Sequence, residues 1–255
     1  MDEARWAQTN TQLLRHLAAH GWTEEDLARV RRAHVVAAMI TSGFQRSTGR
    51  PVLAHVVGVA DALASFGYAP SLVEAALVHT ALGRGTSGVT AAVQRRYNRG
   101  VIRRYLGVDT LRLIERFSDL GGGEAPAVHD GQWSDPDCAA LQLVNIVEEL
   151  DTSAEFLSPR HRRILVDAAQ AGARQAKEAG DPQLAELLTT SAARAEAVEA
   201  SEPSWLDESP GLPVRVSVGW FPPASRHLTA LVPASAVAAA KRARGWRPRA
   251  RTHRR

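Results

Sequence analysis

The chain has 255 residues, of which 45% are hydrophobic and only 5% aromatic. This length allows one large domain, or one domain with an appendage, and provides enough apolar residues to bury a core. The apolar residues are mostly Ala, Leu and Val, which favours packed helices over sheets. We therefore expect an all-α protein.

Composition and charge exclude several classes of protein. The single cysteine, Cys138, excludes an intrachain disulfide and a cysteine-based metal site, and we expect a cytoplasmic protein. No window approaches about 18 uninterrupted apolar residues, so no membrane span is expected. The net charge is +4, but eight of the 31 basic residues lie in 241–255, which leaves 23 basic and 27 acidic residues in 1–240. A basic tail on an acidic body is weaker evidence for nucleic-acid binding than a basic body.

Apolar residues at helical spacing, separated by Gly and Pro, predict a series of helices. Acidic residues follow the N-cap Thr23, and the pairs Asp135-Pro136, Ser158-Pro159 and Asp181-Pro182 each combine a capping residue with proline. We expect short helical stretches between Gly85 and Leu120, a glycine-rich loop over 121–133, and longer helices over 3–20, 23–42, 52–66, 70–82, 135–150, 159–179 and 182–200. Together these helices form a predicted domain over residues 1–200.

The composition changes after residue 202. Val214, Val216 and Val218 alternate with other residues, which indicates a short strand. We interpret 203–240 as a small extended appendage. Residues 241–255 carry eight like charges and few apolar groups, so we expect a disordered tail that could bind nucleic acid or an acidic partner.

Two predicted helices each carry a histidine within a recognisable pattern. Residues 45–55 read Gln-Arg-Ser-Thr-Gly-Arg-Pro-Val-Leu-Ala-His, and residues 77–81 read Leu-Val-His-Thr-Ala, which places His55 and His79 24 positions apart. These stretches resemble the hydrolase half of the RelA/SpoT-type alarmone enzymes, which belong to the HD-domain superfamily. The resemblance covers about residues 10–155 and implies an HD-domain-like helical bundle.

The resemblance also implies a metal site, which this sequence would build only in part. In that family two histidines and two aspartates hold a divalent cation such as Mn²⁺ or Mg²⁺, which activates a water molecule. Here His55 and His79 are kept, but Thr80 and Asn145 stand where the aspartates are expected. An even closer resemblance is to an HD-like family with a Leu-Ala-His-x-x-Gly helix, which also lacks the HD aspartate.

Each candidate site residue has a functional and a structural interpretation. The 24-residue spacing on two successive helices predicts that His55 and His79 face each other. They are either ligands that face one pocket or half-buried helix residues that bind their neighbours. Arg46 and Arg50 flank a Ser-Thr-Gly turn, where arginine forks could cradle phosphate or sulfate, although loop arginines are commonly just solvated.

Substitute carboxylates are available on the predicted helix 135–150 and just beyond it. Glu148, Glu149 and Asp151 lie close to Asn145 in the sequence and could replace the lost ligands, but a solvated acidic face is the expectation.

We therefore expect a degenerate, non-catalytic or weakly active HD-like protein that binds a small anionic, phosphate- or nucleotide-like ligand. We expect no resident cofactor. The first alternative is an active metal-dependent phosphohydrolase that uses the substitute carboxylates with Mn²⁺ or Mg²⁺. The second is an interaction protein that acts through its basic tail.

Overall fold

A computed structural model describes residues 5–46, 48–83, 89–121 and 135–201. These residues belong to a compact unit, Met1–Val214, and the predictions for the appendage 203–240 and the tail 241–255 lie outside them. All regular elements in the described part of the chain are helices, so the all-α prediction is confirmed for it. None of these helices is long and apolar enough to cross a membrane.

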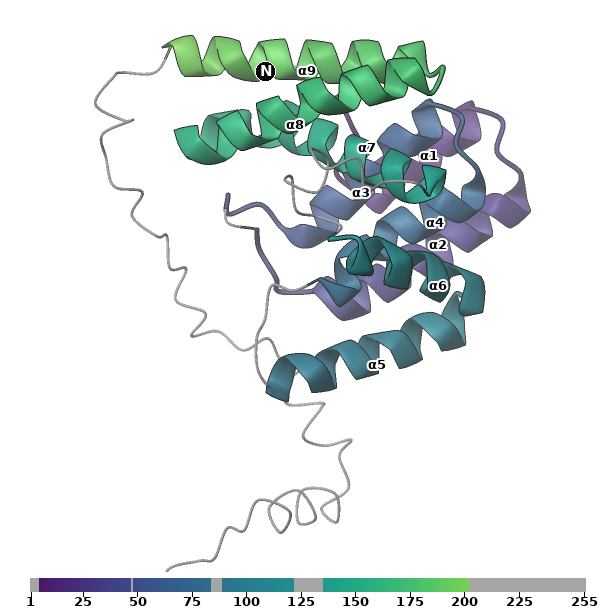
Figure 1. The fold of residues 1–255 in the computed structure, drawn as a ribbon. Coiled ribbons are helices and arrows are strands. Elements are labelled where there is room, and N and C mark those ends of the chain that lie inside the picture. The colour runs from purple at the N-terminus through teal and green to yellow at the C-terminus, as the bar shows by residue number, and fades with distance from the viewer. Residues whose placement is uncertain (1–4, 47, 84–88, 122–134, 202–255) are drawn as a thin grey trace, which may run out of the picture. The chain divides into compact units, whose positions relative to one another are not determined.

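Along the described part of the chain, helix follows helix in sequence order (Figure 1). Most are α-helices, and a 3₁₀ turn follows each of α4 and α7. The elements are α1 (Asn10–Ala19), α2 (Glu24–Thr41), α3 (Val52–Ser65), α4 (Pro70–Val78), η1 (His79–Leu82), α5 (Val89–Tyr105), α6 (Val108–Asp119), α7 (Pro136–Ser153), η3 (Ala154–Phe156), α8 (Pro159–Glu178) and α9 (Pro182–Ser201).

The predicted helix starts are confirmed where a capping residue precedes a proline. The Asp135 side chain accepts from the backbone N–H groups of Asp137 and Cys138, and Ser158 and Asp181 cap α8 and α9 in the same way. These side chains satisfy backbone donors that a helix leaves unpaired at its first turn.

Three predictions differ from the structure. The expected short helical stretches before Leu120 are two full helices, α5 and α6, of 17 and 12 residues. The first helix begins at Asn10 rather than near residue 3, because Thr9 caps it by accepting from the N–H of Gln12. The segment before it is anchored instead, since the backbone N–H of Ala7 donates to the buried carboxylate of Asp61 at 2.8 Å. The expected helix 70–82 also tightens into the 3₁₀ turn η1 at His79, which changes the direction of the following side chains.

The helix α7 lies at the centre of the described unit and contacts α3, α4, α6, α8 and α9. Almost every side chain from Cys138 to Leu150 is buried. The helix α3 is similarly enclosed, with every residue from His55 to Ala64 buried, and it packs against both α4 and α7. The polar residues of these two helices are therefore held inside the core rather than on the surface.

Candidate functional site

The loop before α3 is closed on itself and fixes the positions of two arginines. Gln45 and Pro51 form an isolated antiparallel bridge, and the N–H of Arg46 donates to the carbonyl of Arg50 at 2.9 Å. Gly49 completes the turn with a φ of +81°, a conformation that glycine adopts without strain. The loop therefore holds Arg46 and Arg50 side by side, next to the first turn of α3.

His55 and His79 lie against each other, as their spacing predicts. Their ring centroids are 5.3 Å apart in an edge-to-face arrangement, and the side chains are 0% and 3% exposed. The contact follows from the packing of α3 against α4, because η1 continues directly from the end of α4. The predicted proximity of the two imidazoles is confirmed.

The partners of both rings fix the position of the ring proton. Nδ1 of His55 lies 2.5 Å from Oε2 of Glu148, and Nδ1 of His79 lies 2.6 Å from the carbonyl oxygen of Ala76. Because these partners accept hydrogen bonds, each neutral ring carries its proton on Nδ1 and keeps a lone pair on Nε2. This tautomer, with a second acceptor behind the ring, is the one that metal-binding histidines use.

Both imidazoles are held in their neutral form. Burial lowers the pKa of His55 well below its ordinary value, and the positive charge of Arg46 lowers it further. Burial lowers the pKa of His79 to about 3, with further contributions from His55 and Arg46. The charge of Arg46 therefore makes the potential at both rings more positive.

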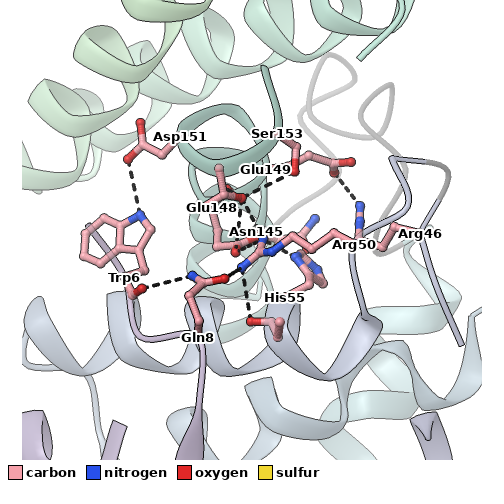
Figure 2. Close-up of polar contacts among 12 residues, drawn as sticks. Trp6, Gln8, Arg46, Arg50, His55, Asn145, Glu148, Glu149, Asp151 and Ser153 are labelled. Atoms are coloured by element: carbon pink, nitrogen blue, oxygen red, sulfur yellow. Dashed lines mark hydrogen bonds and ion pairs between the residues drawn. The ribbon is translucent and has the colours of Figure 1, made fainter. Parts of the chain in front are cut away.

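Glu148 joins the arginine pair to the histidine pair (Figure 2). Its carboxylate accepts from Nη1 of Arg50 and from Nδ1 of His55, and its side chain is 0% exposed. Burial raises the pKa of Glu148, although the adjacent Arg50 acts in the opposite direction. Glu149, which is 5% exposed, pairs with Arg46 at 2.6 Å. The expected solvated acidic face is therefore wrong, because α7 turns both carboxylates toward the loop and α3.

The two arginines differ in how many of their donors remain available. Arg50 directs its four Nη hydrogens at Glu148, Thr152, Gln8 and the carbonyl of Ala54. Arg46 pairs only with Glu149 among the residues that the structure describes. A guanidinium has five N–H donors, so Arg46 keeps most of its hydrogen-bonding capacity while Arg50 serves to hold Glu148.

Asn145 faces His79 with its side-chain amide. The atom assigned as Oδ1 lies 3.2 Å from Nε2 of His79. With the His79 proton on Nδ1, this arrangement would bring two acceptors together. A half-turn of the amide, which exchanges oxygen and nitrogen at the same positions, lets Nδ2 donate to Nε2. We place the amide in that orientation, in which Asn145 occupies the lone pair of His79.

Three polar atoms of the loop and the histidine pair's surroundings are buried without a hydrogen-bond partner in the described structure: Oγ1 of Thr48, Nε2 of His55 and Oγ1 of Thr80. Thr80 follows His79 in η1. A buried polar atom of this kind costs free energy unless a ligand or an ordered water satisfies it. The loop and the residues around the histidine pair therefore hold one unpartnered ring nitrogen, on His55, and two unpartnered hydroxyls.

The site residues do not fit a divalent metal ion. The described ranges contain no group of three His, Cys, Asp or Glu side chains that could hold one. Asn145 fills one of the two imidazole lone pairs, and the nearby carboxylates are bound to Arg46 and Arg50. A cation would therefore have to displace an arginine and bind where the arginine charge already repels it.

Asp151, the third substitute carboxylate, lies on the other side of this arrangement. It accepts from Nε1 of Trp6 at 3.2 Å and pairs with Arg5 and Arg194. In Figure 2 it points away from His55, toward Trp6. Asp151 thus fastens the N-terminal segment to α7 and is not close to the histidine pair.

Sequence reasoning did not identify Gly58 and Gln8 as parts of the site. A Cβ built on Gly58 would lie 2.5 Å from Oε1 of Glu148, so the missing side chain is what admits the carboxylate beside His55. The signal was present in the Leu-Ala-His-x-x-Gly pattern, where the glycine follows His55 by three positions and so shares its helix face.

A comparison with protein-family models finds no match for this chain. A comparison with curated proteins also finds none.

Gly58→Ala is expected to destabilise the protein by about 1–3 kcal/mol, the usual cost of overpacking a core. Glu148 cannot move away freely, because Arg50 and His55 hold it. Gly100→Ala in α5 is the matched control: it meets nothing within 4 Å and should stabilise by about 0.5–1 kcal/mol through helix propensity. Urea unfolding of both variants measures the difference, and equal effects would contradict the assigned role of Gly58.

Proposed function

We propose that this chain is a non-catalytic HD-like domain that binds a small phosphate-type anion beside its histidine pair. The observation that carries the proposal is the position of Arg46. Its charge acts on both imidazoles, its side chain is 22% exposed, and most of its donors have no partner among the described residues. An oxyanion is the ligand that matches a guanidinium fork.

The unpartnered atoms support a ligand at this position. A protonated phosphate group both accepts and donates hydrogen bonds, so its chemistry matches a donor such as Arg46 and an acceptor such as Nε2 of His55. The HD-like assignment of the fold rests on the sequence resemblance and is supported by the contact between His55 and His79. Because Glu148 and Glu149 are paired with arginines and are not available as metal ligands, we propose no hydrolytic step.

The rival interpretation is an active metal-dependent phosphohydrolase that uses Glu148, Glu149 or Asp151. The ion pairs of these carboxylates argue against it. Elemental analysis of the purified protein tests it directly. We expect no stoichiometric divalent metal and no metal-dependent hydrolysis of GDP or an alarmone nucleotide. A metal at one equivalent, or a hydrolysis that His79→Ala abolishes, would favour the enzyme.

Calorimetric titration with inorganic phosphate and with GDP tests anion binding itself. Arg46→Lys keeps the charge that Glu149 needs but loses the planar fork, so we expect about tenfold weaker binding. Arg15→Lys, on the exposed face of α1, is the matched control and should bind as the unmodified chain does. Equal affinity of the unmodified chain and Arg46→Lys, or no binding of either probe, would refute the proposal.

A further inference from the structure

A surface cleft lies between α2 and α5. None of the residues that line it belongs to the site around His55 and His79. The cleft has a volume of about 410 Å³ and is lined by Arg31, Arg32, Val35, Val36, Met39 and Tyr105. The five residues from α2 are spaced three and four apart, so they form one stripe of that helix. Tyr105 comes from the last turn of α5.

Large apolar side chains that line the cleft are exposed to solvent. Val35, Met39 and Tyr105 are 54%, 46% and 51% exposed. They are three of the seven large hydrophobic residues that are exposed in the described part of the chain. Single exposed apolar residues are ordinary, but a cluster in one concave place indicates an interaction surface.

The rim of the cleft is positively charged. Arg31 and Arg32 line the cleft, are exposed and form no ion pair within the described ranges, and Arg104 at the end of α5 is likewise exposed without an ion pair there. Arg104 lies over the ring of Tyr105 at 5.6 Å. The helix α5 contains no acidic residue, in contrast to the excess of acids over positions 1–240. The charge of the cleft is therefore not neutralised by its own surroundings.

We propose that this cleft binds an acidic amphipathic helix of a partner protein. An apolar stripe on that helix would cover Val35, Met39 and Tyr105. Acidic residues beside the stripe would pair with Arg31, Arg32 and Arg104. The half-exposed floor makes the cleft an open groove, which suits a helix better than a small ligand, because small-ligand sites enclose most of their ligand.

Other occupants fit the cleft less well. A symmetric contact with a second copy of the chain would bring Arg31 and Arg32 against arginines of the same surface. Nucleic acid would be attracted by the arginines, but its phosphates gain nothing from Val35 and Met39, and only Tyr105 could stack on a base.

Fluorescence anisotropy with the full-length chain tests the proposal. The probe is a labelled helical peptide of about 16 residues with Leu at i, i+4 and i+7 and Glu beside them. The comparison probes are a scrambled peptide of the same composition and a single-stranded oligonucleotide of equal charge. We expect the amphipathic peptide to bind at least about tenfold more tightly than either comparison probe, and more weakly as salt is added.

Two groove variants separate the charged and the apolar contributions. Arg31→Glu with Arg32→Glu, and separately Met39→Glu, should each weaken peptide binding by at least about tenfold. Arg15→Glu on α1 is the control and should leave binding unchanged. The basic residues of 241–255 are present in every variant, so differences among variants report on the groove. These positions are exposed, and circular dichroism verifies that the variants fold.

Four results would overturn the proposal. They are equal binding of the scrambled peptide, tighter binding of the oligonucleotide that Arg31→Glu with Arg32→Glu weakens, no difference between the groove variants and the control, and a dimer in sedimentation that Met39→Glu dissociates.

Discussion

Glu148→Leu should destabilise the protein by about 3–5 kcal/mol, the cost of leaving a buried charge without its partner. Glu148 is the acceptor for both Arg50 and the Nδ1–H of His55. The guanidinium cannot lose its proton in a protein, and its side chain is only 14% exposed. Arg50 has no inexpensive way to respond to the loss of the carboxylate.

Replacing Arg50 instead of Glu148 should destabilise the protein less. In Arg50→Met, Glu148 can take up a proton, and burial already raises its pKa. The double variant Arg50→Met with Glu148→Leu should recover most of the stability, because a buried ion pair can often be replaced by apolar side chains without loss. Urea unfolding measures all three variants.

A surface pair supplies the control. Arg99 and Glu115 are 50% and 34% exposed in their side chains, so Glu115→Leu should change the stability by less than about 1 kcal/mol. If Glu148→Leu cost no more than Glu115→Leu, the carboxylate would not be the anchor that the structure indicates.

The helices could be predicted from the sequence because their starts carry local chemical signals. Asp135, Ser158 and Asp181 each bind backbone groups within three residues of themselves, so the information lies in a few adjacent positions. The approach of His55 to His79 could also be predicted, because a helical hairpin brings such positions together. Here a local pattern was sufficient.

The polar cluster could not be predicted in the same way. Periodicity identifies the buried face of a helix only where another face is polar and solvated, and α7 is buried nearly all round. Glu148 and Glu149 therefore looked like surface residues, although their partners Arg50 and Arg46 lie about a hundred positions earlier. The predicted start of the first helix was wrong for a similar reason. The N–H of Ala7 binds Asp61, which is distant in the sequence.

The stability of the protein should fall steeply as the pH drops below 6.5. Both buried imidazoles have a folded pKa below the ordinary value of 6.5, so in this range the unfolded chain binds more protons than the folded one. The stability that the two neutral rings contribute is therefore fully present above pH 6.5. It is lost as the pH falls toward the folded pKa of each ring. Each ring contributes about 1.4 kcal/mol per pH unit.

Glu148 acts in the opposite direction. Its folded pKa is raised, so the folded state binds its proton more readily and gains stability as the pH falls toward the ordinary glutamate value. One carboxylate cannot offset two rings. Between pH 7 and pH 5 we therefore expect a net loss of about 1–4 kcal/mol in the free energy of unfolding, to which the half-buried His34, whose pKa burial also lowers, adds a smaller part.

His79→Leu isolates the contribution of one ring, because the slope of stability against pH does not depend on the absolute stability of the variant. Urea unfolding at intervals from pH 7.5 to pH 5 should give a slope below pH 6.5 that is smaller by about 1.4 kcal/mol per pH unit than that of the unmodified chain. Gly100→Ala, which changes no titratable group and meets nothing within 4 Å, should leave the slope unchanged. A slope unaffected by His79→Leu would mean that the ring is not held neutral by burial. The electrostatic basis for an anion site beside Arg46 would then be lost as well, because that basis requires His79 to be uncharged and enclosed next to the guanidinium.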